Sequence, residues 1–212
     1  MNILALSPRK LPRQARSRAL VDAILDASAH ILAEHGREAL NTNLVAEKAG
    51  VSIGSLYQYF PNRDAIIAAV AERHGHRVHH HVADVDLSGE TTLKNAVRRI
   101  AHSLFAAHAL DPALHAALDG DLAHAHPHGH THTSDGHHSG TKEAMIAQLL
   151  SLPRGVQKEI QRADLKMAAT TVAEIVHAMA HAAIVHPHSR RQPNEFEYEA
   201  VCAAVAYLRT AD

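Results

Sequence analysis

A short segment near the N-terminus carries side chains that could contact a nucleic acid. Tyr57 and Tyr59 each offer a hydroxyl for a phosphate and a ring for a thymine methyl group. Gln58 lies between them, and its amide can pair with adenine through two hydrogen bonds. Gly54 and Ser55 would keep one side of the segment slim, so that its backbone could approach DNA. This combination predicts contact with base edges in a DNA groove.

Histidine is the second chemically distinctive residue, with 21 in 212 residues and seven between His124 and His138. Five of them alternate at every second position: His124, His126, His128, His130 and His132. In an extended chain these imidazoles would share one side and could chelate a divalent metal. Imidazole ligands suit Ni, Zn, Co or Cu, and the spacing does not select among them. The alternative is a disordered polar insertion that binds metal only incidentally.

A further pair, His177 and His181, is separated by four residues, so on a helix the two side chains share one face. Together with His102 or His108 they could form a closed metal site. The alternative is that these are ordinary core or interface histidines of packed helices.

Short helices position the side chains that could contact DNA. Asn41 or Thr42 would cap the first of these helices, and Ser52 would cap the second. Before them, apolar residues spaced by three and four predict a long first helix, which Gly36 would end. Gly50 supplies a turn between the two short helices. The helices predicted in this region span 17–35, 42–49, 53–59 and 63–80. This is the layout of a helix-turn-helix DNA reader.

The rest of the chain also predicts helices, and no strand pattern is present. The expected helices span 93–109, a short stretch from 112, then 142–152, 156–185 and 195–209, with a turn at 153–155. The helix over 156–185 is expected either as one piece or with a kink or interruption. Residues 120–140 are rich in His, Gly, Ser and Thr and show no core pattern, which predicts a mobile loop. The predicted fold class is therefore all-α.

Composition narrows the classes of protein that fit. Hydrophobic residues make up 46% of the chain and aromatics 3%, which favours Ala-rich helices over sheet. The net charge is −1, but the first 18 residues hold five basic residues and no acid. We expect a basic arm that contacts phosphates, and the alternative is a solvated tail.

No apolar run of about 18 residues is apparent, which predicts no membrane span. The single cysteine, Cys202, and the absence of a secretory signal predict the cytoplasm.

Residues 20–70 resemble the DNA-binding domain of the TetR family of bacterial transcriptional regulators. The matching segments are Ala33-Glu34-His35-Gly36, Val45-Ala46-Glu47-Lys48-Ala49-Gly50-Val51-Ser52 and Gly54-Ser55-Leu56-Tyr57-Gln58-Tyr59-Phe60-Pro61-Asn62-Arg63. The resemblance implies a flexible basic arm at 1–16 and a three-helix, helix-turn-helix DNA-binding domain at 17–63. It further implies a helical effector-binding and dimerisation domain at 64–212, which would contain the His-rich loop.

The resemblance also implies which residues meet DNA: Thr42, Asn43, Ile53, Gly54, Ser55, Tyr57, Gln58 and Tyr59, with Arg63 on a phosphate. Leu44 departs from the family, where a basic residue is common at this position, so the operator sequence is expected to differ. The alternative is that Tyr57, Tyr59 and Phe60 pack the bundle, which we accept for Phe60 alone. Two tyrosines and a glutamine at three consecutive positions cannot all face inward.

A homodimer is implied in the same way, with the last two long helices, about 163–185 and 195–208, pairing with their twins. Small residues on these helices would permit close approach: Ala168, Ala169, Ala173, Ala178, Ala182, Ala203 and Ala204. Such a dimer would read the two halves of an inverted-repeat, palindromic operator. The alternative is that these alanines only close the monomer core.

We therefore expect a cytoplasmic, ligand-responsive repressor that an effector releases from DNA. The effector would be a small molecule or, through the histidines, a divalent metal; no cofactor is required and no membrane is involved. The alternative function is a metal-binding or buffering protein whose His-rich loop is its main purpose, but this does not account for the helix-turn-helix. An enzyme is not expected, because the chain lacks a His-Glu-x-x-His motif and a nucleophile elbow.

Overall fold

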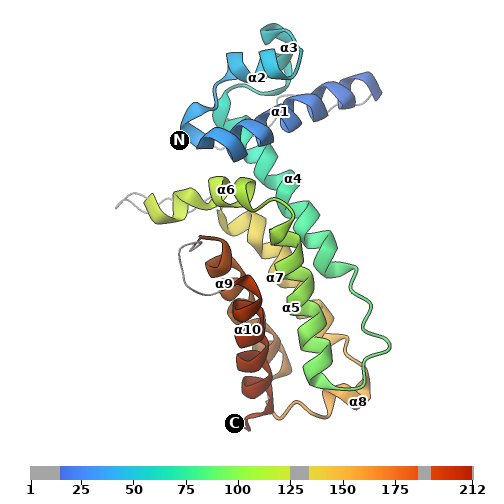
Figure 1. Ribbon diagram of the computed structural model, residues 1–212. Coiled ribbons are helices and arrows are strands. Elements are labelled where there is room, and N and C mark those ends of the chain that lie inside the picture. The colour runs from blue at the N-terminus through green and yellow to red at the C-terminus, as the bar shows by residue number, and fades with distance from the viewer. Residues whose placement is uncertain (1–14, 125–133, 186–191, 212) are drawn as a thin grey trace. The chain divides into compact units, whose positions relative to one another are not determined.

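The computed structural model describes residues 15–124, 134–185 and 192–211, apart from the side chains of 119–124, 134–139 and Val185. Within these residues every regular element is a helix, which confirms the all-α prediction (Figure 1). The helices are α1 (Ala15–Ala39), α2 (Thr42–Lys48), α3 (Ile53–Tyr59), α4 (Arg63–Ala83), α5 (Leu93–Ala109), α6 (Pro112–His124), α7 (Ser134–Leu150), α8 (Arg154–Gln157), α9 (Leu165–Val185) and α10 (Pro193–Arg209).

The chain forms two compact units that are interleaved in sequence. Unit 1 comprises Met1–His74 and Ala113–Ser134, and unit 2 comprises Gly75–Pro112 and Asp135–Asp212. Helix α4 therefore contributes its first half to unit 1 and its second half to unit 2. The domain boundary predicted at residue 63 stays a prediction.

Unit 1 is built on one apolar cluster that α1, α2, α3, the first half of α4 and the start of α6 share. Ile24, Leu56, Ile66 and Leu114 lie in it with no exposed surface. Fully burying an aliphatic side chain of this size is worth about 1.5–3 kcal/mol. The cluster therefore makes the short helices α2 and α3 stable, although helices of seven residues are too short to persist alone.

Local capping sets the boundaries of the short helices as the sequence predicts. The side chain of Asn41 accepts a hydrogen bond from the backbone N–H of Leu44 at 2.9 Å, and α2 begins after it. Ser52 likewise accepts from the N–H of Ser55 at 3.1 Å, and α3 begins after it. Gly50 has a φ of +66°, the left-handed conformation that favours glycine in the turn between them.

Gly36 changes the direction of the chain within α1 rather than ending it. Its φ of 73° and ψ of 178° are not helical, and the helix resumes and runs to Ala39. The prediction that the first helix stops before Gly36 is therefore incomplete, because one further turn precedes the cap at Asn41. That turn places Leu40 in the core with no exposed surface.

Unit 2 packs α5, α9 and α10 against one another, and α7 and the second half of α4 add to the same cluster. Glu159 ties three parts of this unit together. Its carboxylate accepts the N–H of Leu93 at the start of α5, at 2.8 Å, and pairs with Arg209 at the end of α10. The hydrogen bond from Leu93, followed by the bond from Arg209, lowers the pKa of Glu159 below its usual value.

Three predictions about helix limits in the second half of the chain are wrong. Parts of the predicted loop 120–140 are helical, because α6 extends to His124 and α7 begins at Ser134. The turn predicted at 153–155 opens the short helix α8, which follows Pro153. The helix predicted from residue 156 begins only at Leu165, where Asp164 accepts the N–H of Met167 at 2.9 Å and caps it.

Helix α9 is also long and apolar enough, by length and composition, to cross a membrane over Leu165–Ile184. This corrects the expectation that no segment reaches that threshold. The apolar character comes largely from alanine, and the helix packs against α10 and α5 in unit 2. A core helix of a folded domain has these same properties, so the feature is weak support for a membrane span.

Candidate nucleic-acid interface

Helix α3 separates its side chains into a buried and an exposed face. Leu56 has no exposed surface, and Tyr59 is 8% exposed. Ile53 and Tyr57 are 39% and 42% exposed, and Gln58 is exposed as well. The core thus holds the helix rigidly while it offers an isoleucine, a tyrosine and a glutamine outward, as groove reading requires.

Tyr59 differs from its predicted place on the DNA-contacting surface. Its ring belongs to the apolar cluster of unit 1, together with Phe60, which is 1% exposed. The helical period of 3.6 residues explains the difference, because Tyr59 lies three positions after the fully buried Leu56 and shares its face. Phe60 packs in the core, as expected.

A hydrogen bond joins α2 to α3 at the exposed side. The hydroxyls of Thr42 and Tyr57 are 3.1 Å apart, and either can donate. Thr42 is half-buried at the first position of α2, whereas the side chain of Tyr57 projects from the middle of α3. This contact, which spacing along the chain does not reveal, fixes the position of the tyrosine ring.

Gly54 has a conformation that other residues adopt readily, and none of the described residues of unit 1 requires it to lack a side chain. A Cβ built there would meet only the hydroxyl oxygen of Ser52, at 3.9 Å, which is ordinary van der Waals contact. Glycine in a helix costs about 1 kcal/mol relative to alanine. The described fold therefore does not account for a glycine at this position.

The remaining predicted contacts lie around these two helices. Asn43 is exposed on α2, and Leu44 is half-buried and packs against the cluster of unit 1. Ser55 is half-buried, and its hydroxyl lies 2.8 Å from that of Ser52. Arg63 begins α4 with its guanidinium 3.8 Å from the carboxylate of Glu38, and its side chain is 34% exposed. A cation in such a loose ion pair remains accessible to a phosphate.

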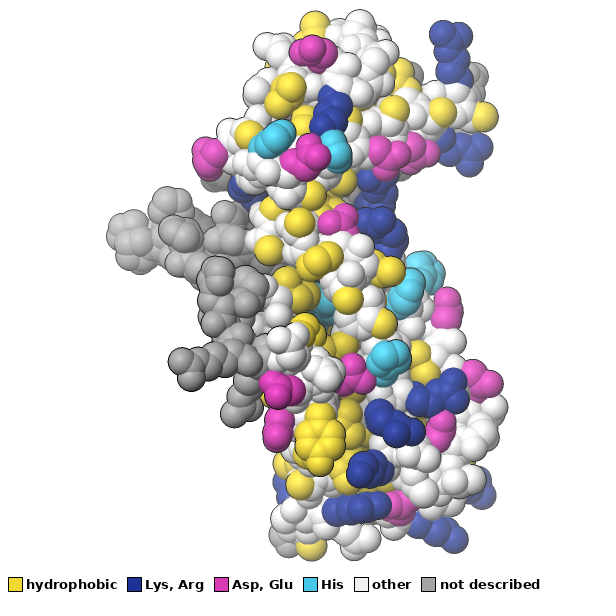
Figure 2. All heavy atoms as spheres, in the orientation of Figure 1, with side chains coloured by type: hydrophobic (Ala, Val, Ile, Leu, Met, Phe, Trp, Pro, Cys, Tyr) yellow, Lys and Arg dark blue, Asp and Glu magenta, His cyan; other side chains and the backbone are white. Residues whose placement is uncertain are grey.

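Charges of both signs are interspersed over the face of the molecule that Figure 2 shows. This agrees with the net charge of −1. On this face, contact with phosphates would depend on individual cations among carboxylates.

The histidines of unit 2 form contacts of two kinds. The rings of His177 and His181 have centroids 5.8 Å apart, and His108 lies 6.1 Å from His177. His108 donates from Nδ1 to the carbonyl of Leu104 at 2.8 Å. His102 instead contacts the carboxylate of Glu197, with Nδ1 and Oε1 3.1 Å apart. The structure thus brings His108, but not His102, to the predicted pair.

Across the described part of the chain, no group of three or more His, Cys, Asp or Glu side chains is arranged to hold a metal ion. The predicted ligands His126, His128, His130 and His132 lie outside the described residues, and so does the side chain of His124. The prediction of a metal site in the His-rich segment stays a prediction.

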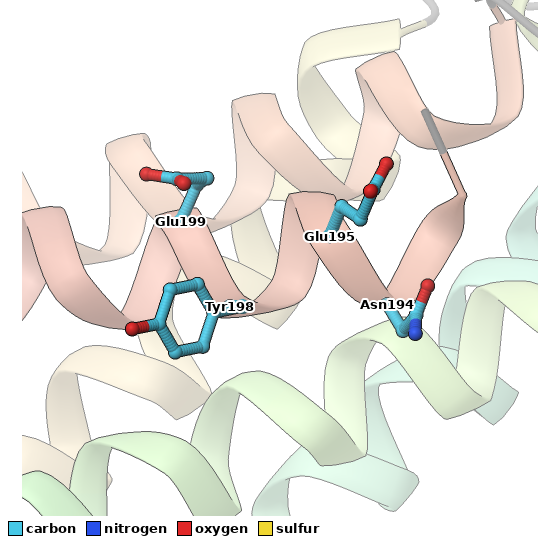
Figure 3. Close-up of a pocket in the computed structure, with 4 residues that line it drawn as sticks. All are labelled: Asn194, Glu195, Tyr198 and Glu199. Carbon is cyan, nitrogen blue, oxygen red and sulfur yellow. The ribbon is translucent and has the colours of Figure 1, made fainter. Parts of the chain in front are cut away.

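One surface hollow of about 630 Å³ lies along α10 and is lined by Asn194, Glu195, Tyr198 and Glu199 (Figure 3). These residues come from the first two turns of the helix. Two carboxylates would repel phosphate groups, so this hollow is unsuited to nucleic acid. The α2–α3 surface of unit 1 is therefore the better candidate.

Two family models match this chain. The model described as "Bacterial regulatory proteins, tetR family" matches residues 24–70, and the model described as "Tetracyclin repressor-like, C-terminal domain" matches residues 92–208. The first match contains α2 and α3, and the second contains α5 through most of α10.

Curated relatives are similar over part of the chain. The HTH-type transcriptional repressor KstR of Mycolicibacterium smegmatis is 33% identical over 90 residues, which cover 42% of this chain and 44% of the relative. KstR of Rhodococcus jostii is 36% identical over 55 residues, 26% of each chain. These matches span less than half of the relatives' length.

Solved structures share the fold over nearly the whole chain. A putative TetR-family transcriptional regulator from Mesorhizobium loti has a TM-score of 0.70 at 19% identity and covers 92% of this chain and 98% of its own. The fatty acid degradation regulator FadR from Bacillus halodurans has a TM-score of 0.63 at 15% identity, with coverage of 92% and 97%. At these identities the likeness is one of fold.

Proposed function

The chain belongs to the TetR family of bacterial regulatory proteins, and from that premise we propose a cytoplasmic repressor that binds an inverted-repeat operator as a homodimer and leaves it when an effector binds. The observation that carries the proposal is the exposed face of α3. Gln58, Tyr57 and Ile53 point outward there, while buried Leu56 holds the helix. Gln58 would read adenine, and the hydroxyl of Tyr57 would meet a phosphate.

Binding to a pool of random duplexes tests this proposal. The full-length protein should enrich one sequence with two inverted half-sites about one helical turn apart, as a twofold dimer requires. Binding to the enriched duplex should be saturable and should weaken steeply as salt rises. Binding that stays at the level of an unrelated duplex would contradict a sequence-specific repressor. The same assay with DNA that flanks the protein's own gene tests for self-regulation.

Replacing Arg63 by alanine should weaken binding to every duplex by a similar factor. The guanidinium is proposed to neutralise a phosphate, which carries no sequence information, so specificity should survive. The slope of log affinity against log salt should fall by about 1 for each Arg63, and so by about 2 for the dimer. Salt titrations of the wild type and the variant measure this. Arg98→Ala is the matched control, because Arg98 is exposed on α5 of unit 2, and it should leave the slope unchanged. A loss confined to the enriched operator would contradict the phosphate role.

Replacing Gly54 by alanine should change stability and DNA affinity in opposite directions. The fold accommodates the new Cβ, so helix propensity should stabilise the protein by up to about 1 kcal/mol. The same Cβ would stand between the α3 backbone and the groove, where overpacking costs about 1–3 kcal/mol. Thermal melting and operator titration measure the two effects. Unchanged affinity would show that DNA does not approach α3 at Gly54.

We propose that the dimer forms through α9 and α10, but with fewer alanines than predicted. Ala168, Ala169, Ala173 and Ala204 are at most 1% exposed within one chain, so they serve the monomer core. Ala178 and Ala203 are exposed and Ala182 is half-buried, which leaves them available to a second copy. The exposed side chains of Met167 and Tyr198 lie on the same two helices and would add apolar area.

The effector is proposed to bind unit 2 and to be a small molecule, as in the family generally. A divalent metal is the second candidate, because His177 and His181 share one face of α9 with ring centroids 5.8 Å apart. The described residues supply no complete set of three ligands, so further ligands would have to complete the coordination. Ni, Zn, Co and Cu added singly to the operator assay test it. Release by one metal, lost in His177→Ala or on deletion of 122–138, would support the metal and identify the ligands. Equal operator binding with all four would contradict it.

A further inference from the structure

Unit 1 exposes two large apolar side chains among its described residues, and both are on α3. They are Ile53, 39% exposed, and Tyr57, 42% exposed. Because they are four residues apart, they lie on one face of the helix, one turn from each other. All other large apolar residues described in this unit are less exposed, so the core does not account for this pair.

Ile53 has no structural task that would explain a large apolar group at its position. It is the first residue of α3, directly after the cap Ser52. The apolar contact that commonly stabilises a helix start joins the residue before the cap to the fourth helical residue. Here those are Val51 and Leu56, which both belong to the cluster of unit 1 or pack against it. Ile53 is outside that cluster.

The two neighbours of Ile53 on the exposed side leave its side chain accessible. Gly54 adds no side chain beside it, and a Cβ there would fit the fold. The ring of Tyr57 is held through its hydroxyl, 3.1 Å from that of Thr42. The side chain of Ile53 is therefore an exposed apolar group between Gly54, which has no side chain, and the ring of Tyr57.

In the major groove the C5-methyl of thymine is the apolar group that a base edge presents, and the other bases offer polar donors and acceptors. We propose that Ile53 is a specificity residue that packs against a thymine C5-methyl in each operator half-site. Thr42 acts as a positioning residue, because it holds the Tyr57 ring that borders this methyl. The inference rests on the proposed function and adds the chemical feature of the operator that Ile53 recognises.

Removing single methyl groups from the DNA tests the inference. The probe is the duplex that the wild-type protein enriches, with each thymine pair of the two half-sites replaced in turn by deoxyuridine. Burial of one methyl corresponds to about a fourfold change in an equilibrium constant. When deoxyuridine replaces the contacted thymine in both half-sites, the affinity of the wild-type protein should therefore fall about 15-fold. Replacement of the other thymines should change the affinity little.

The variant Ile53→Ala should remove this difference, so that thymine and deoxyuridine duplexes bind equally at that position. Leu150→Ala is the matched control, because Leu150 is 37% exposed at the end of α7 in unit 2. This variant should keep the wild-type ratio of affinity for the thymine duplex to affinity for the deoxyuridine duplex. Thr42→Val, which keeps the shape of the side chain and removes its hydroxyl, should reduce the ratio partly. Circular dichroism should show that all three variants are folded.

Two outcomes separate this inference from the function on which it rests. A wild-type protein that enriches an operator but binds the deoxyuridine forms equally well at every position overturns the methyl contact alone. The same holds if Ile53→Ala keeps the wild-type ratio. Failure to enrich any duplex would overturn the proposed function and the inference together.

Discussion

Replacing Gln58 by alanine is expected to weaken specific operator binding strongly and to leave the protein folded and dimeric. The side chain is exposed on α3, so its removal leaves no cavity in the core of unit 1. A bidentate contact to adenine contributes about 1–3 kcal/mol of discrimination, and a dimer makes it twice. The expected loss is therefore about 2–6 kcal/mol, or roughly 30-fold to 10⁴-fold in affinity for the operator.

Fluorescence anisotropy with the enriched operator and with an unrelated duplex measures this loss. Affinity for the unrelated duplex should be nearly unchanged, because phosphate contacts dominate there. Gln161→Ala is a matched control, since Gln161 is exposed in unit 2 and its hydrogen bond to Leu208 uses the backbone N–H, which the substitution keeps. If Gln58→Ala binds the operator as the wild type does, the face of α3 proposed to contact DNA is wrong.

Tyr57→Ala is expected to lose operator affinity and to stay folded, as Gln58→Ala does.

Replacing Ala203 by aspartate is the second substitution with a large expected effect, here on dimer formation. Ala203 is exposed on α10 within one chain, so the new carboxylate would be solvated in the monomer. In the proposed dimer it would be buried without a partner, which costs about 3–5 kcal/mol. The dimer dissociation constant should therefore rise by roughly 10²–10⁴-fold, and operator binding should fall with it because each monomer reads one half-site.

Analytical ultracentrifugation over a range of protein concentrations measures the dimer, and circular dichroism measures the fold. The control is Ala147→Asp, which places the same charge on an exposed alanine of α7 in the same unit. That variant should remain dimeric and bind DNA normally. A dimer that tolerates aspartate at residue 203 would show that the twofold interface lies elsewhere.

The helix-turn-helix was predictable because its limits depend on neighbouring residues. Asn41 and Ser52 cap α2 and α3 through bonds to N–H groups three residues on, and Gly50 supplies a turn at positive φ. Such contacts follow from local spacing. The motif in 45–63 therefore indicated both the fold and the family before any contact between distant residues was known.

The start of α9 and the existence of α8 were missed for the opposite reason. Residues 156–164 have a helix-compatible composition, but Gln161 gives its N–H to the carbonyl of Leu208, 2.8 Å away on α10. Glu159 is likewise drawn to Leu93 and Arg209. These partners are remote in sequence, and they compete with the hydrogen bonds of a continuous helix. Tertiary contacts of this kind override local propensity.

Taken alone, the sequence determined the all-α class and the helix-turn-helix, because capping and apolar spacing are properties of a few adjacent residues. Only the tertiary structure decided which side of α3 is free. It placed Tyr59 in the core and left Ile53, Tyr57 and Gln58 outside. It also assigned four of the seven predicted interface alanines to the monomer core, and brought Thr42 to Tyr57 and His108 to His177. The physical reason is that spacing along one helix tells which residues share a face, whereas burial of that face and hydrogen bonds between helices depend on how distant parts of the chain pack.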